Sequence, residues 1–186
     1  MVDRGIEIRS QRARIAIVFA LLALALPARA EEPSREYQVK AAFIYNFVQF
    51  VEWPASAFQS DSSPITIGIL GSNPFGDVLE RIVEGKTIRG RPLAVRYWST
   101  IEQVDQCQVI FVNSSDPAFL SELQAKLKGK NVLSIGEADQ FLSNGGVIRL
   151  YDEDNKVRFE INVDAAEQQK LKLSSKLLRL AKIFAQ

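Results

Sequence analysis

The 186-residue sequence contains no histidine. This absence excludes Ser-His-Asp and Cys-His catalysis as well as zinc sites built on histidine, and it removes the side chain that most often acts as a general base near neutral pH. Carboxylates, lysine or serine could still form a catalytic site, but no such constellation stands out in the sequence. We therefore expect a protein that is not an enzyme and that needs no metal and no cofactor.

Cysteine is also scarce, because Cys107 is the single one. One cysteine can form neither an internal disulfide nor a thiolate metal cluster. Its apolar neighbours, among them Val104, Val109 and Phe111, favour burial beside a core strand, since unpaired cysteine behaves as a small hydrophobic residue. The alternatives are a reactive thiol or a disulfide to another chain.

One long apolar run occurs, and it lies at the start of the chain. Residues 15–26 are uncharged and apolar, and a basic segment precedes them with arginines at positions 4, 9, 12 and 14. Ala28-Arg29-Ala30 follows, which is typical of a cleavage site. We interpret residues 1–30 as a signal peptide and expect export to a bacterial periplasm with Glu31 as first residue. The alternative is an uncleaved anchor, although the run is short for a membrane span.

Charge of one sign does not dominate the rest of the chain. Of the 23 Lys and Arg and 22 Asp and Glu, the first thirty residues hold five and two, so residues 31–186 carry 18 basic and 20 acidic side chains. A formal charge of −2 lacks the basic surface of a nucleic-acid-binding protein. The length fits a single domain over residues 31–186.

Short β-branched runs alternate with helical segments over the first two thirds of this domain, and paired strands follow. Strands in sequence are expected at 65–70, 93–98, 107–112 and 132–135, with a hairpin at 147–151 and 156–162. Helices are expected at 36–53, at 117–128 and from 164 onward, and a further helix is expected to begin at a cap, Ser72 or Asn73, and to end at 83. A last helix is expected at 174–184, and its inward-facing residues are Leu177, Leu178, Leu180, Ala181 and Phe184.

Strands that alternate with helices favour right-handed crossovers and a parallel sheet. We therefore predict an α/β fold, a three-layer sandwich whose mostly parallel sheet has its first four strands in the order 2-1-3-4, with the antiparallel hairpin added at the edge. Ligands of such sheets bind beyond the carboxyl ends of the strands, where the order reverses. This predicts a crevice with Asn73, Asn113 and Ser114 as ligand-binding residues. Capping and turn formation explain the same residues without a ligand.

The helix predicted at 36–53 carries a lysine on its apolar side. Lys40 projects opposite Gln49 on the helical wheel. Glu36, one turn earlier, could neutralise the ammonium, or the ammonium could reach solvent near the helix start. A role in binding an anionic ligand is the alternative. The acidic segment at 152–155 lacks the spacing of a calcium loop and is interpreted as a solvated hairpin turn.

Several stretches together resemble the YfiR/HmsC family. They cover nearly all of residues 31–186, in the order YQVKAAFIYNFVQFVEWP (37–54), ILG (69–71), PFG (74–76), GK (85–86), GR (90–91), CQVIFV (107–112), VLSIG (132–136), GGVI (145–148), VRFEIN (157–162) and LSSKLLRLA (173–181).

This resemblance implies a periplasmic repressor that binds the periplasmic domain of an inner-membrane diguanylate cyclase and lowers cyclic di-GMP signalling and biofilm formation. It also implies sequestration by an outer-membrane OmpA-like lipoprotein, and a homodimer. Lys40, Asn46, Arg158 and Asn162 are polar positions within the family motifs; they are candidate binding residues, and for Asn46 and Asn162 we favour buried structural hydrogen bonds. The alternative function is a periplasmic sensor of a nucleotide, amino acid or organic anion at the predicted crevice.

One departure from the family concerns its disulfides. The resemblance implies a cysteine pair between the first and third strands, but here Gly68 stands where the partner of Cys107 is expected. Whether redox control survives without that pair is left open by the sequence. Loss of such a cross-link typically costs about 2–5 kcal/mol, which packing or dimerisation must offset.

Overall fold

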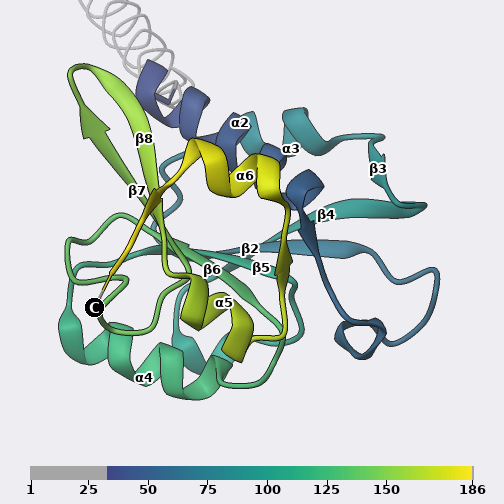
Figure 1. Ribbon diagram of the computed structural model, residues 1–186. Helices are drawn as coiled ribbons and strands as arrows, with labels where there is room; N and C mark the ends of the chain where they lie inside the picture. The colour runs from purple at the N-terminus through teal and green to yellow at the C-terminus, as the bar shows by residue number, and fades with distance from the viewer. Residues whose placement is uncertain (1–32, 186) are drawn as a thin grey trace, which may run out of the picture. The chain divides into compact units, whose positions relative to one another are not determined.

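Alternating helical and strand segments form a mixed α/β fold over residues 33–185, the part of the chain that the computed structural model describes (Figure 1). A mostly parallel sheet with added antiparallel strands is present, which confirms the predicted α/β class. The hairpin is not the edge of the sheet, because the short strand at 182–183 pairs beyond it. The predicted signal peptide and the residue that follows it lie outside the described residues. Within residues 33–185, no helix combines the length and the apolar character that a membrane span requires.

The central sheet has eight strands within the described residues. In spatial order they are β10 (Lys182–Ile183), β8 (Lys156–Ile161), β7 (Ile148–Glu153), β6 (Leu133–Gly136), β5 (Val109–Asn113), β2 (Ile65–Gly71), β4 (Arg91–Trp98) and β3 (Thr87–Ile88). Neighbours pair in parallel except for the β7–β8 and β3–β4 hairpins, which are antiparallel. A separate antiparallel pair joins β1 (Val51–Glu52) to β9 (Lys172–Leu173).

Helices cover both faces of the sheet, and each face has its own buried apolar cluster. The α-helices are α2 (Arg35–Phe50), α3 (Val78–Val83), α4 (Pro117–Leu127), α5 (Val163–Gln168) and α6 (Ser175–Leu180). Residues of α2, α3, α5 and α6 belong to the larger cluster, and α4 supplies the other one. Successive residues of β5 alternate between the two clusters, as expected of a strand that is buried on both faces.

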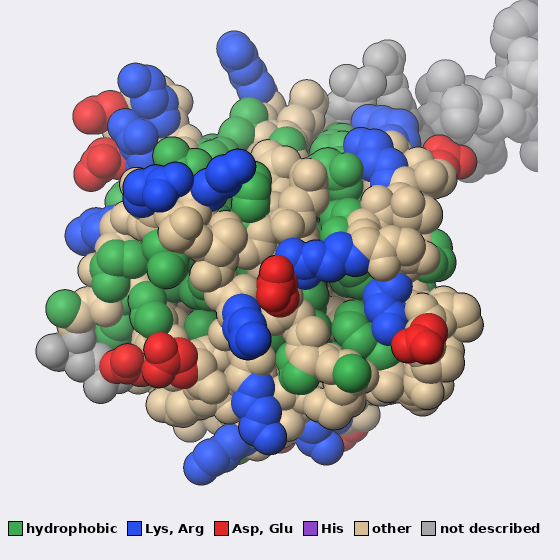
Figure 2. Space-filling view, turned by 45° about the vertical axis from the view of Figure 1, so that its right-hand side comes forward, with side chains coloured by type: hydrophobic (Ala, Val, Ile, Leu, Met, Phe, Trp, Pro, Cys, Tyr) green, Lys and Arg blue, Asp and Glu red, His purple; other side chains and the backbone are tan. Residues whose placement is uncertain are grey.

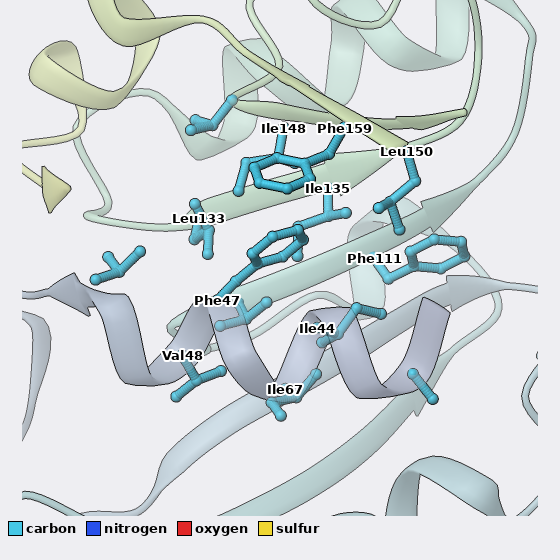
Figure 3. Packing of buried hydrophobic residues seen from close by; sticks show 14 of the residues in the cluster. Ile44, Phe47, Val48, Ile67, Phe111, Leu133, Ile135, Ile148, Leu150 and Phe159 are labelled. Carbon is cyan, nitrogen blue, oxygen red and sulfur yellow. The ribbon is translucent and has the colours of Figure 1, made fainter. Parts of the chain in front are cut away.

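Helix α2 supplies the longest apolar surface of the larger cluster. Ser34 caps its start by accepting a hydrogen bond from the Tyr37 backbone N–H. Ile44, Phe47 and Val48 point from the helix toward the sheet (Figure 3). The Phe47 ring packs against the Phe159 ring of β8, with centroids 5.0 Å apart. This helix therefore fixes the position of the β7–β8 hairpin.

Two predicted helices were too long, because strand pairing ends them. Helix α2 stops at Phe50, where β1 begins to pair with β9. Helix α6 stops at Leu180, since Lys182 and Ile183 join the sheet beside β8. The prediction that Leu180 faces inward was wrong, because 73% of its surface is exposed.

The turn after β2 also differs from the prediction. Helix α3 begins only at Val78, because the Asn73 side chain accepts from the Phe75 N–H at 2.9 Å and donates to the Gly76 carbonyl at 2.7 Å. These bonds close a turn in which Pro74 is not helical. The short strand β3, which pairs with the start of β4, was not predicted.

Cys107 is buried in the cluster under α4, as predicted, and burial raises the pKa of its thiol to about 12. Gly68 does not lie opposite this cysteine, because the strand register pairs Gly68 with Ile110. The Trp98 ring fills the space above Gly68, and a Cβ there would lie 1.9 Å from a ring carbon. The expected alignment of position 68 with Cys107 was therefore wrong.

Replacement of Phe47 tests the contribution of α2 to the core. Phe47→Ala removes a fully buried ring and leaves a cavity against Phe159, so we expect the free energy of unfolding to fall by about 3–5 kcal/mol. Urea unfolding followed by circular dichroism measures it. The control Gln49→Ala changes an exposed residue of the same helix and should cost less than about 0.5 kcal/mol; equal losses for the two variants would contradict this packing role.

Candidate binding site at the carboxyl ends of the strands

The predicted crevice residues come from the loops that follow β2 and β5. Gly71 and Asn113 are register partners at the ends of these strands. The Asn113 amide donates to the Ser72 carbonyl at 3.0 Å and to the Ser72 hydroxyl at 2.8 Å. Gly71 has φ +94°, and a Cβ at this position would lie 3.0 Å from the Asn113 carbonyl oxygen. The two loops are therefore held together through Asn113 and Ser72, with Asn73 next in the chain.

Hydrogen bonds within the loops occupy these polar side chains. Ser114 accepts from the Asp116 N–H at 3.2 Å, and Asp116 caps α4 by accepting from the Ala118 N–H at 3.0 Å. Asn73 is occupied by its own turn. These bonds favour the interpretation as caps and turns. Binding of a ligand by Asn73, Asn113 and Ser114 stays a prediction.

A surface hollow of about 320 Å³ lies beside this turn, and of the three predicted residues only Asn73 lines it. Its other walls include Tyr97 of β4 and Glu80 of α3. The Tyr97 hydroxyl donates to the Glu80 carboxylate. Burial, followed by this hydrogen bond and the charge of Glu80, raises the pKa of Tyr97 above its ordinary value.

The most strongly built polar arrangement at this end of the sheet surrounds Lys40. Lys40 is only 2% exposed. Its ammonium donates to the carboxylates of Glu36 and Glu137, and it lies 3.3 Å from a carboxylate oxygen of Asp152. The predicted pairing with Glu36 is confirmed. We call Lys40, Glu36, Glu137 and Asp152 the Lys40 cluster.

The Lys40 cluster joins three separate elements. Glu36 and Lys40 lie one turn apart on α2, Glu137 directly follows β6, and Asp152 belongs to β7. The predicted solvated turn is confirmed at Asp154 and Asn155, whereas Asp152, also exposed, lies in the strand and is an ion-pair partner of Lys40. The cluster therefore ties α2 to the carboxyl ends of two neighbouring strands.

The electrostatics of the cluster favour a charged lysine. Burial alone would lower the Lys40 pKa, but the hydrogen bonds and charges of Glu137 and Glu36 outweigh it and raise this pKa well above its ordinary value. Tyr37 donates to Glu137 at 3.3 Å, and burial followed by the charge of Glu137 raises the Tyr37 pKa. Among residues 33–185, no group of His, Cys, Asp and Glu has the arrangement of a metal site.

The other motif residues lie apart from this cluster. Asn162 is buried, caps α5 through the Ala165 N–H at 2.9 Å and donates to the Leu142 carbonyl at 3.1 Å, so the structural interpretation is confirmed for it. Asn46 is exposed and accepts from Gln49, so the expected burial of Asn46 was wrong. Arg158 is exposed on β8, with its nearest carboxylate, Glu153, at 3.9 Å.

Sequence reasoning missed Glu137 and Asp152. Both are far from Lys40 in the chain, and only the parallel pairing of β5, β6 and β7 brings them to α2. One signal was available: a lysine on the apolar side of a helix requires buried partners, and Glu137 follows a predicted core strand. Their identity could not be read without the strand order.

Comparison with known proteins identifies the family. Residues 37–182 match the protein family described as YfiR/HmsC-like. This range runs from α2 to β10, and the chain belongs to this family. YfiR/HmsC-like proteins are periplasmic regulators associated with a diguanylate cyclase.

One solved structure resembles the chain more distantly. It is described as an ABC domain in complex with L-Trp from Streptococcus pneumonia, with 11% sequence identity and a TM-score of 0.47. The match covers 80% of this chain but spans only 60% of that one. Similarity at this level supports no inference about function, and the bound tryptophan is a property of that protein.

Replacement of Lys40 tests whether the cluster stabilises the fold. Lys40→Met keeps the apolar stem but leaves three carboxylates without their cation, so we expect the free energy of unfolding at neutral pH to fall by about 1–3 kcal/mol. The loss stays below that of a fully buried pair because the carboxylates retain contact with solvent. Urea unfolding measures it, with Lys176→Met at an exposed position as control. A Lys40→Met variant as stable as the control would contradict the assignment.

The raised pKa of Lys40 also predicts a dependence on alkaline pH. Because the folded state holds this proton more tightly, the lysine's contribution to stability is complete below the unfolded pKa of 10.5 and decreases as the pH rises beyond it. The comparison is made in a Tyr37→Phe background, which removes the neighbouring phenol. The Tyr37→Phe variant is compared with the double variant that carries Tyr37→Phe and Lys40→Met. The stability difference between these two chains should be constant from about pH 7 to 9 and shrink above about pH 10.5. A difference that grows with pH would count against it.

Proposed function

We propose that this protein represses an inner-membrane diguanylate cyclase by binding the periplasmic domain of that enzyme, which lowers cyclic di-GMP synthesis and biofilm formation. The observation that carries the proposal is the family match, which extends over the whole fold from α2 to β10 instead of a single motif. Export with cleavage after Ala30 is part of the proposal, because the repressor has to reach the periplasmic side of its target.

The surface chemistry of the described residues suits a protein partner. Figure 2 shows a face on which Lys and Arg side chains are interspersed with apolar side chains and a few Asp and Glu. Non-obligate protein interfaces are about as apolar as the rest of a protein surface, so a face of this composition is compatible with a protein partner. The formal charge of −2 over residues 31–186 agrees with this, since strong attraction to a polyanion is not expected.

Two further partners belong to the proposal. An outer-membrane OmpA-like lipoprotein would sequester the repressor and so release the cyclase, and the repressor would act as a homodimer. Cys107 does not supply a covalent link for such a dimer, because it is buried among the side chains of the cluster under α4. The dimer would therefore rest on non-covalent contacts.

A direct binding measurement tests the proposal. The purified protein is titrated by calorimetry into the isolated periplasmic domain of the membrane diguanylate cyclase encoded nearest to it in the genome. We expect saturable binding with a dissociation constant at or below the micromolar range, as for regulatory protein pairs.

The control is an unrelated periplasmic domain of similar size and charge, which should give no heat of binding. The proposal would be wrong if the cyclase domain showed no binding at about 100 μM, or if it bound no more tightly than the control domain. Sedimentation analysis of the free protein, run in parallel, tests the homodimer.

A further inference from the structure

Strand β8 has one side that is only partly paired. Along its full length it pairs with β7, from Lys156 to Ile161. On its other side, β10 covers only Glu160 and Ile161. The remainder of that side, at residues 156–159, borders no other strand of the part of the chain that the structure describes. We call residues 156–159 the free edge of β8.

The register shows which backbone groups point outward along the free edge. The backbone N–H of Asn162 donates to the Val147 carbonyl at 2.9 Å. In an antiparallel ladder the residue pairs that exchange hydrogen bonds recur at every second position, so the next such pairs are Glu160 with Arg149 and Arg158 with Tyr151. Arg158 is therefore bonded to Tyr151 across the ladder, whereas Val157 and Phe159 direct their N–H and C=O groups away from β7. The register of β10 places the Lys182 N–H on the Phe159 carbonyl, so the groups that stay open are the Val157 N–H and C=O and the Phe159 N–H. An open edge of this kind is a template for pairing with a further strand.

A groove of about 540 Å³ runs along this edge. One wall is apolar and includes Phe43 of α2 and Leu180 at the end of α6. Leu180 is the most exposed large apolar side chain of the described residues, and Ile183, which follows on β10, is 49% exposed. Exposed apolar side chains next to free backbone groups mark an interaction surface.

The charged side chains of the groove are mainly basic. Arg158 and Lys182 line it together with Glu153, and Lys156 is the first residue of the free edge. Glu160 is almost fully buried and neutralises Lys182 at 2.7 Å, with Arg149 at 3.3 Å. Lys156 and Arg158 are then left with Glu153 as the one acid of the groove lining, 3.9 Å from Arg158. A partner segment with acidic side chains therefore complements this edge.

Pairing with a second copy of the same strand is disfavoured by charge. An antiparallel pair centred on the free edge places Arg158 opposite the same arginine of the other copy, or opposite its Lys156. Like charges directly opposite each other on neighbouring strands are destabilising. The edge is consequently better suited to a different polypeptide.

We propose that the free edge of β8 binds an extended segment of a partner protein, in which apolar and acidic side chains alternate, by addition of a strand to the sheet. The segment's backbone pairs with the Val157 N–H and C=O and with the Phe159 N–H. Because side chains of a strand alternate between faces, its apolar residues lie toward Phe43 and Leu180, and its acidic residues lie toward Arg158 and Lys156. This inference goes beyond the proposed function, since it does not depend on which protein supplies the segment.

Amide hydrogen exchange followed by NMR tests the proposal. The isotopically labelled protein is mixed with a synthetic ten-residue peptide that alternates valine and glutamate, or with its valine and lysine counterpart. We expect the glutamate peptide to slow exchange at Val157 and Phe159 by at least about tenfold, because their N–H groups become hydrogen-bonded. The lysine peptide should have no effect on these two amides.

Three variants sharpen the test. Val157→Pro removes an outward N–H without touching the bonds to β7, and K156E/R158E reverses the charge of two exposed residues; both should abolish the effect of the glutamate peptide. The control K128E/K130E makes the same charge change at exposed positions at the end of α4, and in this variant the glutamate peptide should still slow exchange. The folding of each variant is checked by circular dichroism, and K156E/R158E keeps the test decisive if Val157→Pro does not fold.

Several results would overturn the proposal: unchanged exchange at saturating glutamate peptide, equal protection by the lysine peptide, or retention of binding in K156E/R158E. Protection that grows with protein concentration and without peptide would assign the edge to self-association instead. The cyclase titration separates the two proposals. If the peptide binds as described and the cyclase domain does not, the proposed function fails alone. If the peptide fails while the cyclase domain binds, the docking proposal fails alone.

Discussion

The burial of α2 against the central sheet is the contact on which the rest of the structure depends. Its apolar face crosses the larger cluster, where Phe47 meets Phe159 and Ile44 lies among residues of neighbouring strands (Figure 3). A helix with so much apolar surface cannot remain in water, and the sheet is the partner that covers it. The same burial carries Lys40 out of solvent. An ammonium in that position requires carboxylates, and the carboxyl ends of β6 and β7 supply Glu137 and Asp152.

This arrangement also shapes the surfaces that are available for binding. At the carboxyl ends of β2 and β5, where a ligand crevice is expected in such folds, the polar side chains are bonded to one another and to the turns. At the β8 side of the sheet, α6 ends at Leu180 and leaves that side chain and part of the strand edge exposed. The fold therefore has a closed polar side and an open strand edge, a distribution that suits a protein that acts by contact with other proteins.

Local sequence patterns predicted the strands and the mixed sheet well. Runs such as residues 65–70 are long enough and sufficiently β-branched to specify a strand without further context. The errors lie where distant segments decide. Helix α6 ends early because Lys182 and Ile183 pair with β8, which outweighs their helical pattern, and α2 ends early because β1 pairs with β9. The helix cap predicted at Ser72 or Asn73 was wrong, since the two hydrogen bonds of Asn73 close a turn and delay the start of α3 to Val78.

The candidate site was predictable only in part, because some of its residues come from distant segments of the chain. Lys40 and its partner Glu36 share one helix, so their spacing predicts the ion pair. Glu137 and Asp152 join them only through the order of the strands.

The proposed repression of the cyclase is tested most directly by the rate of cyclic di-GMP synthesis. This rate is measured for the full-length cyclase in sealed membranes, with the purified protein added to the periplasmic side. We expect a saturable decrease that is lost when the cyclase lacks its periplasmic domain. An unchanged rate at saturating protein, or an equal decrease for the truncated cyclase, would contradict it.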